Sequence, residues 1–288
     1  MTSQQSVSTQ QDWDLIIRPK RAWWDLGLLE VWQYRSLIGL WVRREFVALY
    51  KQTILGPLWH VIPTIISSAV YTLIFSGVAN IPTDNTPPFL FYMAGTTLWV
   101  YFSSCMSSTS TTFSTHAGIF GKVYFPRLVM PISSIISQLI GFATRFGVFF
   151  AFWIYFLLSG STIHPNSWIL FVPVLLLLIA GMGLGLGIII SSLTTKYRDL
   201  RQLLDVGLQL VMYATPIIYP FSQVPEALRG ILLLNPLTPV FETFRLAFLG
   251  TSSLEPVYLW YSAGFTVITL FVSIIIFNSA EKTFLDTI

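Results

Sequence analysis

Charged residues and cysteine are scarce in this 288-residue chain. Only 10% of the residues are charged, whereas about 25% is usual for a soluble domain. Hydrophobic residues make up 54%, and the mean hydropathy is +0.68. The lone cysteine, Cys105, excludes an intramolecular disulfide and a cysteine-rich metal site. With so much apolar surface, the expected solvent for most of the chain is lipid.

Motifs for nucleotide binding and catalysis are also absent. No GxxxxGK[ST] motif occurs, so this chain is not expected to bind ATP through a P-loop, and phosphate-bond energy would have to come from a separate polypeptide. The histidines are scattered, which gives no metal site and no acid–base role. The acidic residues expected outside have no paired spacing, which argues against a multipass transferase or hydrolase. We therefore predict no catalytic residue, no metal and no cofactor.

Six apolar runs, each about 20 residues or longer, predict an all-α integral membrane protein. They lie at about 57–79, 88–112, 128–158, 168–193, 202–221 and 257–278. Lysine and arginine occupy every second connection, whereas IPTDNTPP and SGSTIHPN carry none. By the positive-inside rule both termini are cytoplasmic. A proton-driven transporter would need carboxylates at mid-membrane, and runs one to four and six contain none.

The chain before the first run divides into two parts. Residues 1–21 form a polar tail without the apolar core of a signal peptide, so a disordered cytoplasmic segment is expected. Residues 22–55 predict an amphipathic interface helix with Arg43 and Arg44 on one face and Phe46 and Leu49 on the other. Gly56-Pro57 predicts a turn into the first span. Residues 56–288 then form a single six-span membrane domain.

Two short apolar pieces, near 225–234 and 238–249, lie between the fifth and sixth runs. They are separated by Asn235-Pro236, and each is too short to cross a bilayer, so two re-entrant or interfacial helices entering from the outer face are expected. Arg145 is the sole charge in the third run. A buried membrane charge needs a partner, and we predict that Arg145 pairs with Glu242 of the second short helix.

For two side-chain patterns in the spans, helix packing or local hydrogen bonding is a better explanation than a functional role. Gly181, Gly183, Gly185 and Gly187 form small-xxx-small pairs that favour close helix approach, and their spacing does not match a nucleotide loop. The serine and threonine hydroxyls of 103–112 are expected to bond back to the preceding turn, although a hydroxyl-lined face would also suit a polar passenger.

Two cytoplasmic connections contain the basic and aromatic residues that a partner protein could contact. The sequence THAGIFGKVYFPRLVMP predicts either an ordinary connector or a short helix parallel to the membrane. The second connection, TTKYRDLR, is either a positive-inside anchor or a second contact. The candidate contact residues are Phe120, Lys122, Tyr124, Phe125, Arg127, Lys196, Tyr197 and Arg198.

Aromatic residues make up 16% of the chain. Many tryptophans, Trp59 and Trp99 among them, are expected in membrane-interface belts. A second group is expected toward the outer ends of spans one and five, where aromatic faces could stack on sugar rings or simply face lipid. This second group is Tyr71, Phe75, Tyr213, Tyr219 and Phe221.

Three segments in the same order carry a resemblance to a known family. They are LYKQTILGPLWHVIPTI, KVYFPRLVMPIS and KYRDLRQLLDVGLQLVMYATPIIYPFSQVPEALRGILLLNPLTPVFETFRLAFLG. They resemble the permease subunits of ABC-type polysaccharide exporters, which handle O-antigen, teichoic acids and capsules. The similarity runs from about residue 35 to the C-terminus. The YKQTxLGPLW junction and the NPLTP segment are its specific motifs.

The resemblance implies a six-span half-permease of the bacterial inner membrane. It would form a homodimer, bind two copies of a nucleotide-binding ATPase subunit that carries ATP and Mg, and export a lipid-linked polysaccharide. Residues 30–51, with Arg43, Arg44 and Glu45, would be the interface helix. Residues 115–126 would be the coupling helix, residues 225–249 the outer gate, and spans one and five the glycan path. A permease for lipids or drugs in the same superfamily is the main alternative, and a proton-coupled transporter is the weaker one.

Overall fold

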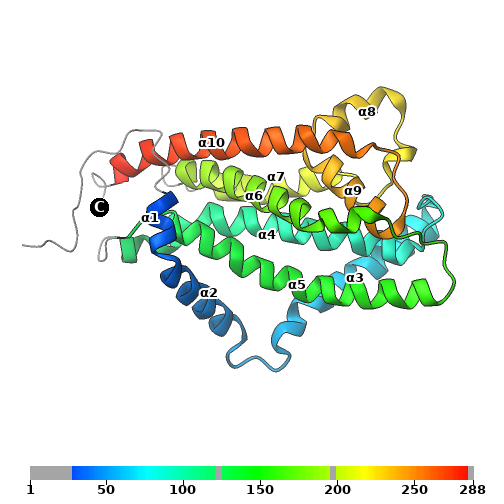
Figure 1. Ribbon diagram of the computed structural model, residues 1–288, viewed down its shortest axis with the longest axis horizontal. Helices are drawn as coiled ribbons and strands as arrows, with labels where there is room; N and C mark the ends of the chain where they lie inside the picture. Colours follow the sequence, from blue (N-terminus) through cyan, green and yellow to red (C-terminus); the bar gives the residue numbers. More distant parts are fainter. Residues whose placement is uncertain (1–27, 121–124, 195–198, 285–288) are drawn as a thin grey trace, which may run out of the picture.

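The chain folds as an all-helical bundle, as the sequence predicts. A computed structural model describes residues 28–120, 125–194 and 199–284, and these residues contain no strand. The long helices run side by side along the longest axis of the molecule (Figure 1). The α-helices are α1 (Leu28–Gln33), α2 (Arg35–Tyr50), α3 (Val61–Tyr71), α4 (Pro88–Phe120), α5 (Val129–Leu158), α6 (Val172–Thr194), α7 (Leu200–Tyr213), α8 (Glu226–Leu233), α9 (Leu237–Leu249) and α10 (Leu259–Phe284).

Four described helical stretches are long and apolar enough to cross a membrane. They are Gly56–Val78, Val129–Leu158, Ser167–Thr194 and Pro256–Phe277. Helix α4, with 33 residues, exceeds the length required, but its serines and threonines lower its hydropathy. Helix α7 has 14 residues, which at 1.5 Å per residue gives about 21 Å. The run predicted at 202–221 is therefore helical only as far as Tyr213, because Pro216 and Pro220 cannot continue the helix.

The predicted turn before the first span is present. Gly56 adopts a φ of +52°, a left-handed conformation that suits glycine. Pro57 lies in the first turn of the 3₁₀ helix Gly56–His60, which leads into α3. The helix then continues from Thr72 to Val78 with the wider π-type hydrogen bonding. A single helical stretch thus begins where the Gly-Pro pair predicts it.

Helices α8 and α9 are bent by 102° relative to each other, at the predicted Asn235-Pro236 break. The Asn235 side chain donates hydrogen bonds to the Ala214 carbonyl (3.1 Å) and the Thr215 hydroxyl (2.8 Å), and it accepts one from the Leu237 amide (3.0 Å). Asn235 therefore links the first residue of α9 to the segment that follows α7. Such a bent pair is either a broken span or a re-entrant loop.

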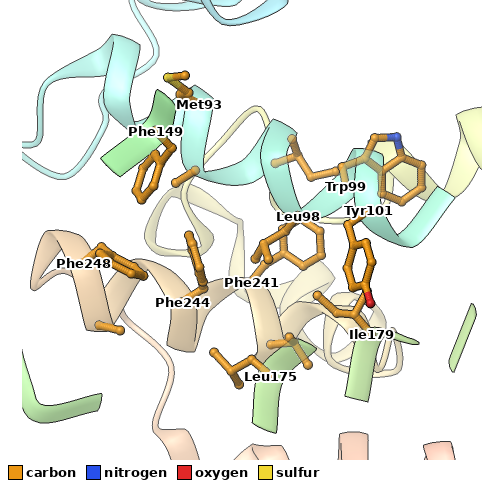
Figure 2. Packing of buried hydrophobic residues seen from close by; sticks show 14 of the residues in the cluster. Met93, Leu98, Trp99, Tyr101, Phe149, Leu175, Ile179, Phe241, Phe244 and Phe248 are labelled. Atoms are coloured by element: carbon orange, nitrogen blue, oxygen red, sulfur yellow. The ribbon is translucent and has the colours of Figure 1, made fainter. Parts of the chain in front are cut away.

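Helix α9 lies in the centre of the main hydrophobic core and is not an interfacial helix. Phe241, Phe244 and Phe248 are almost fully buried and pack against Phe149 and other core residues (Figure 2). The indole N–H of Trp153 donates to the Phe248 carbonyl at 2.7 Å. The sequence predicted a re-entrant or interfacial helix because this piece is too short to cross a bilayer. Its apolar residues cover almost every face of the helix, which allows burial on all sides.

The glycines of α6 allow close approach on two sides, as predicted. A Cβ atom at Gly183 would lie 2.7 Å from the Cβ of Cys105 in α4, and one at Gly187 would lie 2.6 Å from the Cβ of Thr109. Gly185 faces the other neighbour, α10, where a Cβ would lie 3.1 Å from backbone atoms of that helix. Alternate glycines thus place α6 between α4 and α10.

Most hydroxyls of α4 serve the helix itself. Ser108, Thr111 and Thr112 donate to carbonyls three or four residues earlier. The default interpretation of these residues is confirmed. They leave few free donors for a polar passenger on this stretch of α4.

Candidate functional site

The N-terminal helices are attached to the bundle by one apolar cluster. Val31 of α1 and Trp41 of α2 are buried in one cluster with Phe125, which precedes α5, and with Val129 and Met130 in the first turn of α5. Phe46 and Leu49, which the sequence placed on the apolar face of α2, are 37% and 55% exposed. These two residues do not belong to the cluster and remain available to lipid.

The charged residues predicted for the interface helix have distinct environments. Arg44 is exposed, and its guanidinium lies over the Trp41 ring at 4.5 Å. Glu45 accepts a hydrogen bond from the Ser134 hydroxyl of α5 at 3.4 Å. Arg43 is exposed. Of the three residues, Glu45 thus contacts another helix, whereas Arg44 stacks within α2 and Arg43 is exposed.

The predicted coupling helix at 115–126 is not a separate helix in the described residues. Helix α4 continues without a break as far as Phe120, whose side chain is outside the described part. Lys122, Tyr124, Lys196, Tyr197 and Arg198 also lie outside the described residues. The predicted boundary before residue 115 is absent because residues 113–120 contain no proline that would end α4.

Phe125 is only 7% exposed and points into the cluster with Val31 and Trp41, so it is not presented to a partner as predicted. Arg127, two residues later, is partly exposed. The connection between α4 and α5 is therefore joined to the N-terminal helices through Phe125.

Replacing Phe125 by alanine should loosen α1 and α2 while leaving the bundle folded. Truncation of a buried phenylalanine removes about 3–5 kcal/mol of packing, here confined to the small cluster with Val31 and Trp41. We expect faster trypsin cleavage at Arg43 and Arg44 and an unchanged size-exclusion profile. The control is Phe46→Ala, because Phe46 is already exposed. Equal cleavage rates in wild type and both variants would contradict this role of Phe125.

The predicted pair of Arg145 and Glu242 is wrong. Glu242 accepts hydrogen bonds from Arg245 (3.1 Å) and from the Ser252 hydroxyl (3.2 Å). Arg245 also donates to the Ile217 carbonyl at 2.9 Å. The Glu242 carboxylate is paired with the arginine three residues further along its own helix, at the spacing that brings side chains of one helix together.

A cavity of about 340 Å³ lies where α3, α4 and α5 meet, with Met212 of α7 at its edge. Arg145 is one of its lining residues, together with His60 and hydroxyl side chains. Three of its lining residues are aromatic: Trp59, Trp99 and Tyr71. Aromatic faces, hydroxyls and a guanidinium thus line one cavity within the candidate membrane region.

The five aromatic residues predicted to line a path lie in different environments. Tyr71 lines the 340 Å³ cavity. The Phe75 ring packs edge-on against the Tyr71 ring, with 5.7 Å between the ring centres. Tyr219 lines a second cavity of about 460 Å³ near Asn80–Pro82 and donates to the Tyr213 carbonyl at 3.0 Å. Tyr213 is 52% exposed, whereas Phe221 is only 5% exposed. They do not form one continuous wall.

Sequence reasoning missed His60, Trp59 and Trp99 as cavity residues. The two tryptophans were assigned to interface belts, and His60 received no role. One signal could have found the first two: Trp59 and His60 directly follow the Gly56-Pro57 turn, which places them at the start of the first span. Trp99 has no such signal, because only helix packing decides which face of α4 borders the cavity.

The family model described as "ABC-2 type transporter" matches residues 36–249. The chain belongs to this family. The match extends from α2 to the end of α9 and so includes every element of the 340 Å³ cavity.

Curated relatives match this ABC-2 family chain over nearly their whole lengths. An O-antigen export system permease protein RfbA of Klebsiella pneumoniae is 28% identical over 252 residues, which is 87% of this chain and 94% of the relative. The protein of the same name from Myxococcus xanthus is 28% identical over 268 residues, 90% of this chain and 98% of the relative. The polysialic acid transport protein KpsM of Escherichia coli is 25% identical over 249 residues, 85% and 93%.

Proposed function

We propose that this chain is the transmembrane half-permease of an ATP-driven exporter that moves a lipid-linked polysaccharide from the cytoplasm across the bacterial inner membrane. The observation that carries the proposal is the nearly full-length similarity to relatives named as O-antigen and polysialic acid transport proteins. The cavity of Trp59, Tyr71 and Trp99 supports it, because aromatic faces stack on sugar rings and nearby hydroxyls can hydrogen-bond to them.

The proposed membrane arrangement has six spans. Helices α4 and α7 join the four stretches that are long and apolar enough, and α8 with α9 forms a re-entrant outer gate. Helix α1 and the end of α10 lie at the same end of the bundle, opposite α8 and α9 (Figure 1), which agrees with both termini being cytoplasmic. The basic connections 121–127 and 196–201 would then face the cytoplasm.

Energy would come from two copies of a separate ATPase subunit bound to a homodimer of this chain, with ATP and Mg on that subunit. The contact residues proposed are Phe120, Lys122, Tyr124, Arg127, Lys196, Tyr197 and Arg198. The cluster of Phe125, Val31 and Trp41 would pass a displacement of this contact surface to α2. Spans one and five of the two copies would enclose the glycan path.

A permease for lipids or drugs is the second candidate function. It is favoured by an almost wholly apolar cavity of about 500 Å³ along α7. Met182 and Leu186 of α6 and Phe265 of α10 are among its other lining residues. An acyl chain or an apolar drug would fit such a lining better than a sugar would.

The experiment that separates the two functions is reconstitution with the ATPase subunit in liposomes. ATP hydrolysis that depends on the complex, rises with lipid-linked glycan and accompanies glycan movement would support the polysaccharide exporter. Stimulation by lipids or drugs, with no response to glycan, would support the second candidate. Hydrolysis unaffected by every addition would contradict both functions.

A further inference from the structure

Arg145 is a buried cation without a counterion. Its side chain lies in α5 and is only 3% exposed, and its Nε and Nη2 atoms have no hydrogen-bond partner among the described residues. No ion pair is present between Arg145 and a described carboxylate, and Glu242, its predicted partner, is paired with Arg245. A guanidinium removed from water is unfavourable unless an anion or several acceptors replace its hydration. The guanidinium of Arg145 is therefore suited to binding a negatively charged ligand.

A second donor lies beside this guanidinium. A Cβ atom placed on Gly141 would be 3.5 Å from Nη1 and 3.6 Å from Nη2 of Arg145, and also 3.6 Å from Nε2 of His60. Both polar groups thus converge over position 141, where glycine leaves the space between them open. Gln138 lies one turn before Gly141 on the same face of α5 and is also a lining residue of the cavity. The Tyr50 ring packs edge-on against His60 at 5.8 Å.

The remainder of the cavity contains neutral donors and no acid. Thr64, Ser67 and Ser104 contribute hydroxyls, and none of the residues that line the 340 Å³ space is aspartate or glutamate. One permanent cation surrounded by neutral donors selects an anion over a cation or a neutral sugar. The planar fork of arginine matches the oxygens of a phosphate, to which it can bond through two parallel N–H groups.

The position of the cavity restricts the source of that anion. Its lining includes residues of α3 and α5, both of which lie in stretches apolar enough to cross a membrane. A free phosphate would lose its hydration on entering this region, whereas a phosphate attached to an apolar tail is carried there by the tail. Trp59, Trp99 and Tyr71 form walls that can contact the apolar or sugar portion of the same molecule.

The geometry points to a binding site for the phosphate or diphosphate group of a lipid in this cavity, with Arg145 as the principal cation and His60 as a second donor. This inference rests on the proposed function to the extent that the lipid is the carrier of the exported glycan. A bilayer phospholipid offers the same phosphate chemistry, and the two sources are separated by experiment.

The test measures lipid binding to the purified chain in phosphatidylcholine nanodiscs. The probes are a synthetic polyprenyl diphosphate, the matching polyprenol without phosphate, and phosphatidylglycerol. We expect Arg145→Gln to weaken polyprenyl diphosphate binding about tenfold or more, the size expected when charge-assisted hydrogen bonds are lost. Polyprenol binding should not change. Arg145→Lys should give an intermediate loss, because it keeps the charge but not the fork.

The control is Arg201→Gln, which removes an exposed arginine at the start of α7 and should bind every probe as wild type does. The ligand-free Arg145→Gln protein should melt at the same temperature as wild type or higher, because the variant removes a buried unpaired charge. A folded variant with weaker binding therefore reports the site and not damage to the fold. His60→Leu is a second variant that keeps Arg145 and should weaken the diphosphate by a smaller factor.

Loss of phosphatidylglycerol binding in Arg145→Gln, with polyprenyl diphosphate unaffected, would support the phosphate site and assign it to a bilayer lipid. Unchanged binding of all three probes to Arg145→Gln and His60→Leu would overturn the inference. Because binding is measured without the ATPase subunit, it is independent of the export experiment. Failure of glycan export with Arg145-dependent binding intact would remove the proposed function and leave the site standing.

Discussion

Gly187→Leu in α6 is expected to prevent formation of the stable bundle. A Cβ atom at this position would lie 2.6 Å from the Cβ of Thr109 and 3.0 Å from the backbone carbonyl oxygen of Met106. Neither atom belongs to the far end of a flexible side chain, so α4 and α6 would have to move apart along their shared surface. Overpacking of a close helix contact costs about 1–3 kcal/mol for small insertions and more for a whole leucine side chain.

The measurement is the thermal midpoint of the detergent-purified protein together with its size-exclusion profile. We expect Gly187→Leu to aggregate or to melt far below wild type. Gly147→Ala is the matched control, because a Cβ at position 147 of α5 would have no neighbour within 4 Å. Alanine there should leave stability unchanged or raise it by about 0.5–1 kcal/mol, the usual gain over glycine inside a helix. A normal midpoint for Gly187→Leu would show that α4 and α6 do not approach this closely.

Glu242→Ala is expected to be the most damaging loss of a single charge. Arg245 is 2% exposed and lies with its guanidinium 3.8 Å from the centre of the Phe91 ring, so removal of its carboxylate partner leaves a buried cation. Removal of one member of a buried pair typically costs about 3–5 kcal/mol. Ser252 would lose a hydrogen-bond acceptor as well. We expect a large drop in the thermal midpoint and loosening of α9, which carries the central phenylalanines.

Two further proteins separate charge from packing in this experiment. The double variant Glu242→Leu/Arg245→Met removes both charges and keeps much of the apolar volume, so it should recover much of the stability lost by Glu242→Ala. Glu226→Ala, at the exposed start of α8, should have a midpoint within about 0.5 kcal/mol of wild type. If the double variant were no more stable than Glu242→Ala, the damage would come from lost volume and not from the unpaired arginine.

Local sequence was sufficient wherever a structural feature depends on adjacent residues. The Gly56-Pro57 turn, the break at Asn235-Pro236 and the close-packing glycines of α6 were all predicted, and the structure contains each of them. Each depends on backbone chemistry that a few residues determine: a positive φ, a missing amide hydrogen or a missing side chain. The apolar runs likewise predicted the helical membrane class.

Predictions that needed a partner from another helix were less successful. Arg145 was assigned to Glu242 because acids are rare, yet Arg245 lies one turn from Glu242 and takes that position. Phe125 was expected to face a partner and instead anchors α1 and α2. Among the candidate path residues, Tyr71 and Tyr219 line two different cavities. In each case the sequence named residues with the right chemistry but not their neighbours.

By itself, the sequence determined that this chain is a helical membrane protein, that helices turn or break at Gly56-Pro57 and Asn235-Pro236, and which glycines permit close packing. Composition, periodicity and backbone chemistry are properties of short segments. Only the tertiary structure decided which face of α2 is buried and that α9 lies in the core. It also brought Trp59, His60, Trp99 and Arg145 to one cavity. The physical reason is that a helix has one period but many possible neighbours. In an apolar chain nearly every face can be buried, so the packing of whole helices selects the contacts.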